Sequence, residues 1–354
     1  MHERTDQPLP RHVIVSDAPE APARAGGEGA DLPSLAEVAH GLPYSKGLMA
    51  MGIMATGLAP ARAFHVAEVI EERLRDNFAD TVTQVELSCL VLAVLEEEEG
   101  ARCAELYAKW QTVRHLDTPL VILLGGATGV GKSTVATMLA NRLGITRVIP
   151  TDAVREVMRA MFSDELLPTL QSSSFETSRV MRHPVPHGSD PVIAGFREQA
   201  SAVAVGIEAL IRRAIDEGTH LVIEGAHVVP GFVDRRRYAG KAVIVPLLVA
   251  VEDEELHRSH FILRGASTLN RPPERYIEHF ENIRCIHRYL MSMAEEHDVP
   301  VVRSYGLDST LASVIDLVVR EAIRSVPDAS EASDLPVIGT PPTIPRAPTE
   351  RGRR

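Results

Sequence analysis

Cysteine is scarce in this 354-residue sequence. The three cysteines, Cys89, Cys103 and Cys285, lie far apart and form no C-x-x-C pair. Disulfide frameworks and structural zinc sites both need cysteines at suitable spacing. The pattern therefore argues against both, and a reducing cytoplasm fits it best. The fourteen histidines show no metal-ligand spacing either.

Long apolar runs are also missing. No stretch approaches the roughly 20 residues that a helix needs to cross a bilayer. The chain opens with MHERTDQPLPRHVIVSD, in which charges and prolines stand where a signal peptide would carry an apolar core. We therefore expect a cytoplasmic protein that is neither exported nor embedded in a membrane.

Positive charge is in deficit. The sequence has 37 lysines and arginines against 48 acidic residues, and its formal net charge is −11. Such a field repels nucleic acid, so we expect no nucleic-acid partner. An anionic small molecule would have to be bound by a local cluster of arginines, lysines and backbone amides.

Two segments lack apolar periodicity. Residues 17–33 and the Pro-rich tail 326–354 have compositions that cannot offset the entropy lost on ordering, so both are predicted to be mobile. Just before the first of them, RHVIVSD is either one strand of a small hairpin or part of a disordered arm. We assign residues 1–41 to a largely mobile segment with a possible short strand.

Helical patterns dominate residues 42–114. Apolar residues from Phe64 to Leu74 recur at helical spacing after Pro60, and Thr83 with Glu86 forms a capping-box start for the next apolar run. The pattern predicts a small, mainly helical domain over this range.

Strand and helix patterns alternate over residues 115–325. Five short apolar runs read as buried strands: PLVILLGG, TRVIP, THLVIEG, KAVIVPLLVAV and VPVVRS. Between them lie helical patterns such as KSTVATMLANRLG, which closes at Gly144. This order predicts an α/β fold with a doubly wound parallel sheet of about five strands, whose ligands bind beyond the carboxyl ends of the strands.

The segment GATGVGKS, between the first of these strands and a helix, fits the P-loop pattern G-x-x-x-x-G-K-S. Its glycines let successive backbone N–H groups point inward toward phosphate oxygens. Lys132 would bridge the outer phosphates of ATP, and Ser133 would offer its hydroxyl to Mg²⁺. The expected nucleotide-binding set is Gly126, Ala127, Thr128, Gly129, Val130, Gly131, Lys132, Ser133 and Thr134.

Two acidic residues follow neighbouring apolar runs. Asp152 ends the second run, with Arg155 one helical turn later, and Glu224 ends the third. Asp152 can take a proton from an attacking hydroxyl or hold a magnesium-bound water, and Arg155 can fork onto an acidic substrate. Glu224 stands where an acid that orients Mg²⁺ is expected. The alternatives are a helix-capping Asp152 beside a surface arginine, and a Glu224 paired with a basic residue at the core edge.

The stretch ELHRSHFILRGASTLNRPPERY carries four arginines around a Gly-Ala-Ser-Thr break and is predicted to be a lid. Arg258 and Arg264 are the stronger candidates for neutralising phosphoryl charge, because they lie close to the strand end and to the apolar residues 261–263 that would anchor the lid. For Arg271 and Arg275 we favour a solvated helix face.

With these residues in view, the chain resembles the 2-phosphoglycerate kinase family, which couples an ATP-cone-like domain to a P-loop kinase domain. The motifs that carry the resemblance are LPYSKGLMAMGIMATGL, GGATGVGKST, TDAVREVMR, LQSSSFET, GFREQ, IEGAHVVPGF, FILRG and YIEHFENIRCIHRYL, which span most of residues 42–324.

The resemblance implies transfer of the ATP γ-phosphate, with Mg²⁺, to the 3-hydroxyl of 2-phosphoglycerate, a small phosphorylated hydroxy acid. It implies that Lys132 and Ser133 contact nucleotide and metal, that Asp152 and Arg155 lie at the acceptor, and that Arg264 belongs to the lid. Two other functions stay open at this point. One is a toxin-like sugar-nucleotide kinase, which would need a broad cleft, and the other is a nucleotide-sensing regulator, which would not need the Asp152–Arg155 pair.

Overall fold

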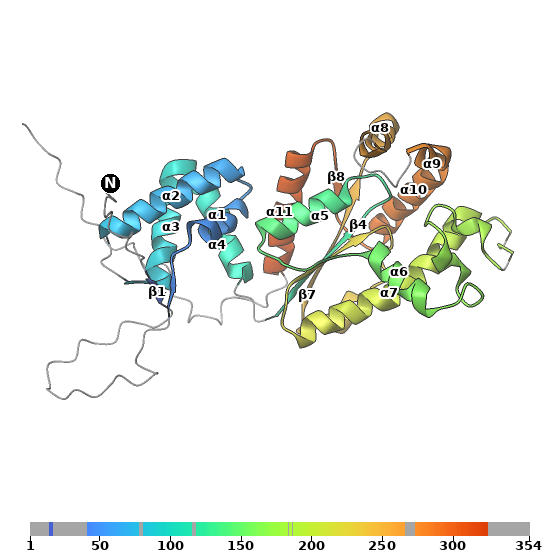
Figure 1. The fold of residues 1–354 in the computed structure, drawn as a ribbon, viewed down its shortest axis with the longest axis horizontal. Helices are drawn as coiled ribbons and strands as arrows, with labels where there is room; N and C mark the ends of the chain where they lie inside the picture. Colours follow the sequence, from blue (N-terminus) through green and yellow to red (C-terminus); the bar gives the residue numbers. More distant parts are fainter. Residues whose placement is uncertain are drawn as a thin grey trace, which may run out of the picture. The chain divides into compact units, whose positions relative to one another are not determined.

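The computed structural model describes residues 14–16, 41–77, 81–114, 118–182, 184–185, 187–265 and 273–324. The predicted mobile segments, 17–33 and 326–354, lie outside these residues. The chain forms two compact units (Figure 1). The described part of the smaller unit lies before Leu48 and over Phe64–Glu105, and the larger unit contains Leu48–Ala63 and the described residues from Leu106 onward.

A three-stranded sheet opens the smaller unit. Its strands, in spatial order, are β2 (Gly41–Pro43), β1 (Ile14–Ser16) and β3 (Thr81–Thr83). Strand β1 pairs antiparallel with β2 and parallel with β3. The short apolar run RHVIVSD therefore supplies a hairpin strand, which is the first of the two alternatives that the sequence left open.

Four helices lie close to these strands in the sequence. Helices α1 (Lys46–Met54) and α2 (Pro60–Asn77) lie between β2 and β3, and α3 (Gln84–Glu99) and α4 (Ala101–Arg114) follow β3. Thr83 caps α3 as predicted, because its side-chain oxygen accepts from the Glu86 amide and the Glu86 carboxylate accepts from the Thr83 amide. The predicted buried face of α2 is partly wrong: Ala67, Ile70 and Leu74 are buried, whereas Phe64 is exposed.

The larger unit is built on a parallel sheet of five strands. In spatial order they are β5 (Val148–Pro150), β6 (Leu221–Gly225), β4 (Leu120–Gly125), β7 (Val243–Ala250) and β8 (Val301–Arg303). Every neighbouring pair is parallel. All five predicted strands are thus present, and the predicted doubly wound α/β fold is confirmed.

Helices cover both faces of this sheet (Figure 1). One face carries α5 (Lys132–Arg142) and α11 (Leu307–Arg324), and the other carries α6 (Thr151–Met161), α7 (Pro191–Asp216) and α10 (Phe280–Glu296). Successive residues of β4 join different apolar clusters, so the strand is buried from both sides. Helix α5 ends one residue earlier than predicted, since Leu143 is the cap and Gly144 follows with a φ of +65°.

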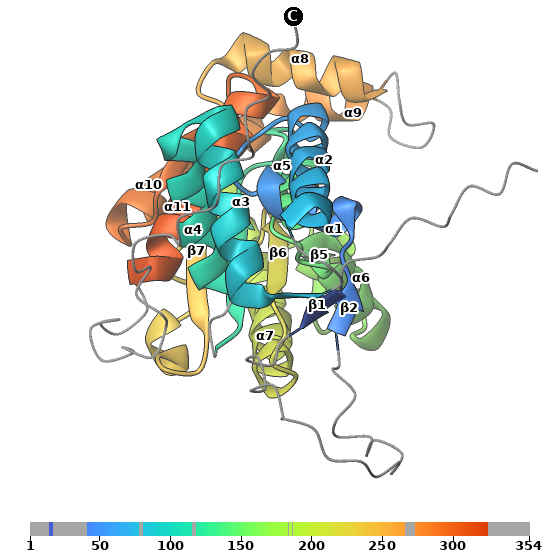
Figure 2. The same ribbon diagram turned by 90° about the vertical axis from the view of Figure 1, so that its left-hand side faces the viewer.

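Two further helices follow β7: α8 (Glu254–Gly265) and α9 (Pro273–Glu278), which contact one another (Figures 1 and 2). Three short 3₁₀ helices, Pro168–Gln171, Thr177–Arg179 and Arg235–Tyr238, lie in the connections. In the part of the chain that the structure covers, no helix has the length and apolar character needed to cross a membrane.

Candidate functional site

The P-loop occupies the connection between β4 and α5. Its backbone follows the conformation that glycine favours: Gly126, Gly129 and Gly131 have φ values of +155°, +90° and +86°. A Cβ atom on Gly129 would lie 2.3 Å from the Phe261 ring, so that position has no room for a side chain. Lys132, the first residue of α5, donates from Nζ to the carbonyl oxygen of Ala127 at 3.4 Å, across the loop.

Ser133 and Thr134 follow in the first turn of α5, and both are exposed. The first turn of a helix presents N–H groups that have no partner within the helix, and these attract anions. The predicted nucleotide-binding residues therefore form one continuous loop and helix start at the carboxyl end of the central strand.

Glu224 lies at the end of β6, beside the P-loop strand. It is opposite Leu124 of β4 in the register of the sheet, one residue before the paired Gly125 and Gly225. The side chain is buried, and its Oε2 atom has no hydrogen-bond partner in the part of the chain that the structure describes. A buried carboxylate oxygen without a partner is costly unless a ligand satisfies it.

These oxygen donors fit Mg²⁺. Magnesium binds hard oxygen ligands, and proteins usually hold it through one or two side chains together with substrate phosphates and waters. The hydroxyl of Ser133 and the orphaned oxygen of Glu224 match that pattern. Within the described ranges, no group of three or more His, Cys, Asp or Glu side chains is arranged to hold a metal ion.

Asp152 and Arg155 lie on one face of α6, as predicted. Asp152 is not the helix cap: the helix begins at Thr151 and Pro150 is the cap residue. The Asp152 side chain is 69% exposed, and its Oδ1 is 3.9 Å from Arg155 Nε.

Arg155 is mostly buried, and its guanidinium binds backbone rather than solvent. Nη1 donates to the carbonyl oxygens of Ser172 at 2.7 Å and Leu170 at 3.2 Å, and Nη2 donates to Glu156 Oε1 at 2.8 Å. Arg155 is therefore not an ordinary surface arginine. It ties the second turn of α6 to the serine segment, residues 172–174.

A buried histidine extends this connection. His227, just after β6, is 1% exposed; its Nε2 lies 3.0 Å from Gln199 Oε1 and its Nδ1 lies 2.9 Å from Thr151 Oγ1. The Gln199 amide nitrogen donates to the carbonyl oxygens of Thr169 and Ser172, so its Oε1 must accept from His227 Nε2–H. His227 Nδ1 then accepts from the Thr151 hydroxyl. Burial lowers the pKa of His227 to about 4, which keeps the ring neutral as this arrangement requires.

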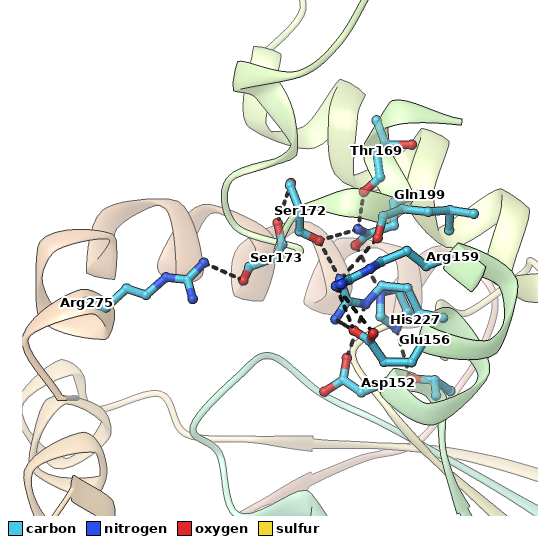
Figure 3. A network of polar contacts seen from close by, with 12 residues as sticks. Asp152, Glu156, Arg159, Thr169, Ser172, Ser173, Gln199, His227 and Arg275 are labelled. Carbon is cyan, nitrogen blue, oxygen red and sulfur yellow. Dashed lines mark hydrogen bonds and ion pairs between the residues drawn. The ribbon is translucent and has the colours of Figure 1, made fainter. Parts of the chain in front are cut away.

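These contacts form one polar network, made of Thr151, Arg155, Gln199 and His227 together with the carbonyl groups that they bind. Figure 3 shows its centre around Gln199, His227 and Ser172. A Cβ atom on Gly225 would lie 1.7 Å from Thr151 Oγ1, so the start of α6 packs directly on the end of β6. The network therefore fixes the turn that carries Asp152 relative to the serine segment.

No sequence pattern by itself assigns a role to Thr151, Gln199 or His227. Each lies inside one of the motifs that carry the family resemblance: TDAVREVMR, GFREQ and IEGAHVVPGF. A signal was therefore present, but it gave no indication that the three side chains meet.

The predicted lid is only partly described. Arg258 stacks on Phe280, with its Cζ 4.1 Å from the ring centroid. Arg264 lies in α8, but its side chain falls outside the described residues, as does all of Arg271. The expected apolar anchor is reduced to Phe261, because Ile262 and Leu263 are exposed.

Arg275 has a role that the sequence did not indicate. It lies on an exposed helix face, as predicted, but it is not without partners: its Nη2 donates to Ser173 Oγ at 2.9 Å (Figure 3), and to the Glu176 carboxylate. Glu176 is also 3.1 Å from His279 Nε2. Arg275 therefore joins α9 to the serine segment, on the opposite side from Arg155.

Solved structures align with this chain only at low similarity. The shikimate kinase of Acinetobacter baumannii, solved with shikimate, aligns over 59% of this chain and 97% of its own, with 16% identity and a TM-score of 0.31. No family model matches the chain.

Curated relatives are much more similar. The 2-phosphoglycerate kinase of Methanopyrus kandleri is 38% identical over 292 residues, which cover 82% of this chain and 88% of the relative. That of Methanothermobacter thermautotrophicus is 39% identical over 293 residues, covering 82% and 95%. That of Thermococcus kodakarensis is 40% identical over 274 residues, covering 77% and 92%. With this identity over most of both chains, the protein belongs to the 2-phosphoglycerate kinase family.

Proposed function

We propose that the protein transfers the γ-phosphoryl group of ATP to the free hydroxyl of 2-phosphoglycerate, giving 2,3-bisphosphoglycerate and ADP. The observation that carries the proposal is the meeting of a P-loop, Asp152 and Glu224 at one edge of the parallel sheet, in a member of this kinase family. The acceptor is accordingly a small phosphorylated hydroxy acid.

The nucleotide end of the site consists of the P-loop and its supports. Backbone N–H groups from Gly126 to Thr134 bind the phosphates, and Lys132 stabilises the charge that moves onto the β–γ bridging oxygen. Ser133 and Glu224 would hold Mg²⁺, with Asp152 as a further candidate through a bound water. When bound, the ion neutralises the charge of the phosphate oxygens.

At the acceptor end, Asp152 is proposed to act as general base. Its carboxylate is exposed and has only a long contact, at 3.9 Å, to Arg155, so it can accept the hydroxyl proton of the acceptor. The hydroxyl oxygen then forms a bond to the γ-phosphorus, the bond to the bridging oxygen of ADP breaks, and ADP leaves with its electron pair.

Arg155, Arg258 and Arg264 remain proposed contacts of the acceptor and the transferred group. Because Nη1 of Arg155 already binds two carbonyl oxygens, we propose that Arg155 affects acceptor binding mainly by holding the serine segment in place. Arg264 is proposed to meet the γ-phosphoryl group from α8.

The test is a substrate panel. Purified protein is incubated with γ-labelled ATP, Mg²⁺ and 2-phosphoglycerate, 3-phosphoglycerate, glycerate or a sugar nucleotide, and the labelled product is identified by mass spectrometry. We expect label in 2,3-bisphosphoglycerate only with the first acceptor. Transfer to a sugar nucleotide alone, or ATP binding with no transfer to any acceptor, would contradict the proposal, and Lys132→Ala protein prepared in parallel controls for contaminating kinases.

A further inference from the structure

Two histidines of α8 bind the tip of the P-loop. His257 Nε2 lies 2.8 Å from the carbonyl oxygen of Thr128, and His260 Nδ1 lies 3.0 Å from that of Gly129. A carbonyl oxygen can only accept, so both ring nitrogens must carry a proton and donate. The two histidines are three residues apart in a helix, which places them on the same face.

A buried arginine supports the first of these contacts. Arg284 Nη1 lies 3.4 Å from His257 Nδ1, and the same guanidinium donates to the carbonyl oxygens of Val251 at 2.8 Å and Glu252 at 2.9 Å. Because Nε2 of His257 holds the proton, Nδ1 is free to accept from Arg284. Burial, together with the nearby Arg284 charge, lowers the pKa of His257 to about 4, so the ring is neutral near pH 7, as this tautomer requires.

The geometry of the peptide bond gives these contacts a consequence for phosphate binding. In a trans peptide, the C=O of one residue and the N–H of the next point in opposite directions, and no peptide bond of the described chain is cis. Holding the Thr128 carbonyl toward α8 therefore turns the Gly129 N–H away from α8. In the same way, holding the Gly129 carbonyl directs the Val130 N–H.

A donor bound to the carbonyl also polarises the peptide. Hydrogen bonds in a chain strengthen one another, so an N–H whose own carbonyl accepts a bond becomes a better donor. The two hydrogen bonds from Arg284 to His257 and from His257 to the Thr128 carbonyl form such a series, and the first donor is a charged guanidinium.

We propose that His257 and His260 are positioning residues for the nucleotide, which orient and polarise the Gly129 and Val130 N–H groups toward the phosphates of ATP. The proposal goes beyond the proposed reaction and rests only on nucleotide binding by the P-loop. Phe261 completes the contact from the same helix, because its ring fills the space beside Gly129.

Matched substitutions separate hydrogen bonding from packing. A glutamine amide nitrogen can stand in for His257 Nε2 and an asparagine amide nitrogen for His260 Nδ1, so His257→Gln and His260→Asn keep the donor, whereas His257→Leu and His260→Leu remove it. ATP dissociation constants are measured by titration calorimetry without acceptor, and KM values for both substrates by steady-state kinetics.

We expect each leucine variant to bind ATP about tenfold more weakly. Each one loses a hydrogen bond to a P-loop peptide whose N–H group binds the charged phosphates of ATP. The KM for ATP should rise, the KM for 2-phosphoglycerate should stay within about twofold, and the Gln and Asn variants should recover most of the affinity.

Two results would overturn the proposal: leucine variants that bind ATP like the wild type, or conservative variants as weak as the leucine ones. Should His257→Leu fail to fold, the comparison of His260→Leu with His260→Asn still decides the question, because His260 is only half-buried. If the wild type binds ATP but does not phosphorylate 2-phosphoglycerate, the proposed function fails while this inference can still be tested.

Discussion

At the scale of single residues, Lys132 is placed for charge stabilisation rather than for packing. Its side chain crosses the P-loop to the Ala127 carbonyl and is only half-buried. We expect Lys132→Ala to lower kcat by about 10³-fold or more, roughly 4 kcal/mol of transition-state stabilisation, because no other group replaces the ammonium beside the bridging oxygen. The thermal midpoint should stay within a degree or two. Turnover at the wild-type rate would show that the P-loop assignment is wrong.

Asp152 allows a second test at this scale. If its carboxylate accepts the hydroxyl proton, Asp152→Asn should reduce kcat by roughly 10²- to 10⁴-fold and leave the ATP dissociation constant nearly unchanged, since an amide cannot take the proton. Asp164→Asn, an exposed aspartate beyond the end of the same helix, is the matched control and should have no effect. A collapse of ATP affinity in Asp152→Asn would instead assign this carboxylate to the metal.

At the scale of elements, Gln199 links α7 to the segment of Thr169 and Ser172 and to His227 after β6. Its amide donates to the Thr169 and Ser172 carbonyls, and its oxygen accepts from His227. Gln199→Met keeps the volume but removes the partner of the buried His227 Nε2–H and one donor from each of the two carbonyl oxygens, which should cost about 1–3 kcal/mol of unfolding free energy. Because the serine segment loses a support while the P-loop does not, the KM for the acceptor should rise and the KM for ATP should not. Equal increases in both KM values would show that the network does not act on the acceptor side alone.

The elements themselves were largely predictable from the sequence. Each strand of the larger sheet is a short apolar run bounded by a turn or a polar residue, and a P-loop is a local motif, so neither depends on distant residues. The network around His227 could not be predicted in this way. His227 is 28 residues from Gln199 and 76 from Thr151, and Arg275 is 102 residues from Ser173. Only the folded chain brings such partners together, and an exposed arginine with partners has the same sequence pattern as one without them.

At the scale of the whole molecule, buried histidines make stability depend on pH. Burial lowers the pKa values of His227, His257 and His287 to about 4 each, and their ordinary value is about 6.5. All three rings are neutral in the folded and unfolded states above pH 7. Below about pH 6.5 the unfolded chain binds protons that the folded chain does not. The free energy of unfolding therefore decreases as the pH is lowered from about 6.5 to about 4. Each histidine contributes a slope of at most about 1.4 kcal/mol per pH unit.

His287 isolates this effect, because its two ring nitrogens have no hydrogen-bond partner in the described structure. We expect His287→Phe to unfold at about the same urea concentration as the wild type at pH 7.5 and at a clearly higher one at pH 5, since the variant has one fewer proton-binding group in its unfolded state. The single tryptophan, Trp110, is buried in the core of the larger unit, so its fluorescence follows the unfolding of that unit. Carboxylates whose folded pKa is lowered, such as Glu176, also weaken the fold in acid, but they do so equally in both proteins and cancel in the comparison. Parallel pH profiles of the two proteins would show that His287 is protonated as easily in the folded chain as in the unfolded one.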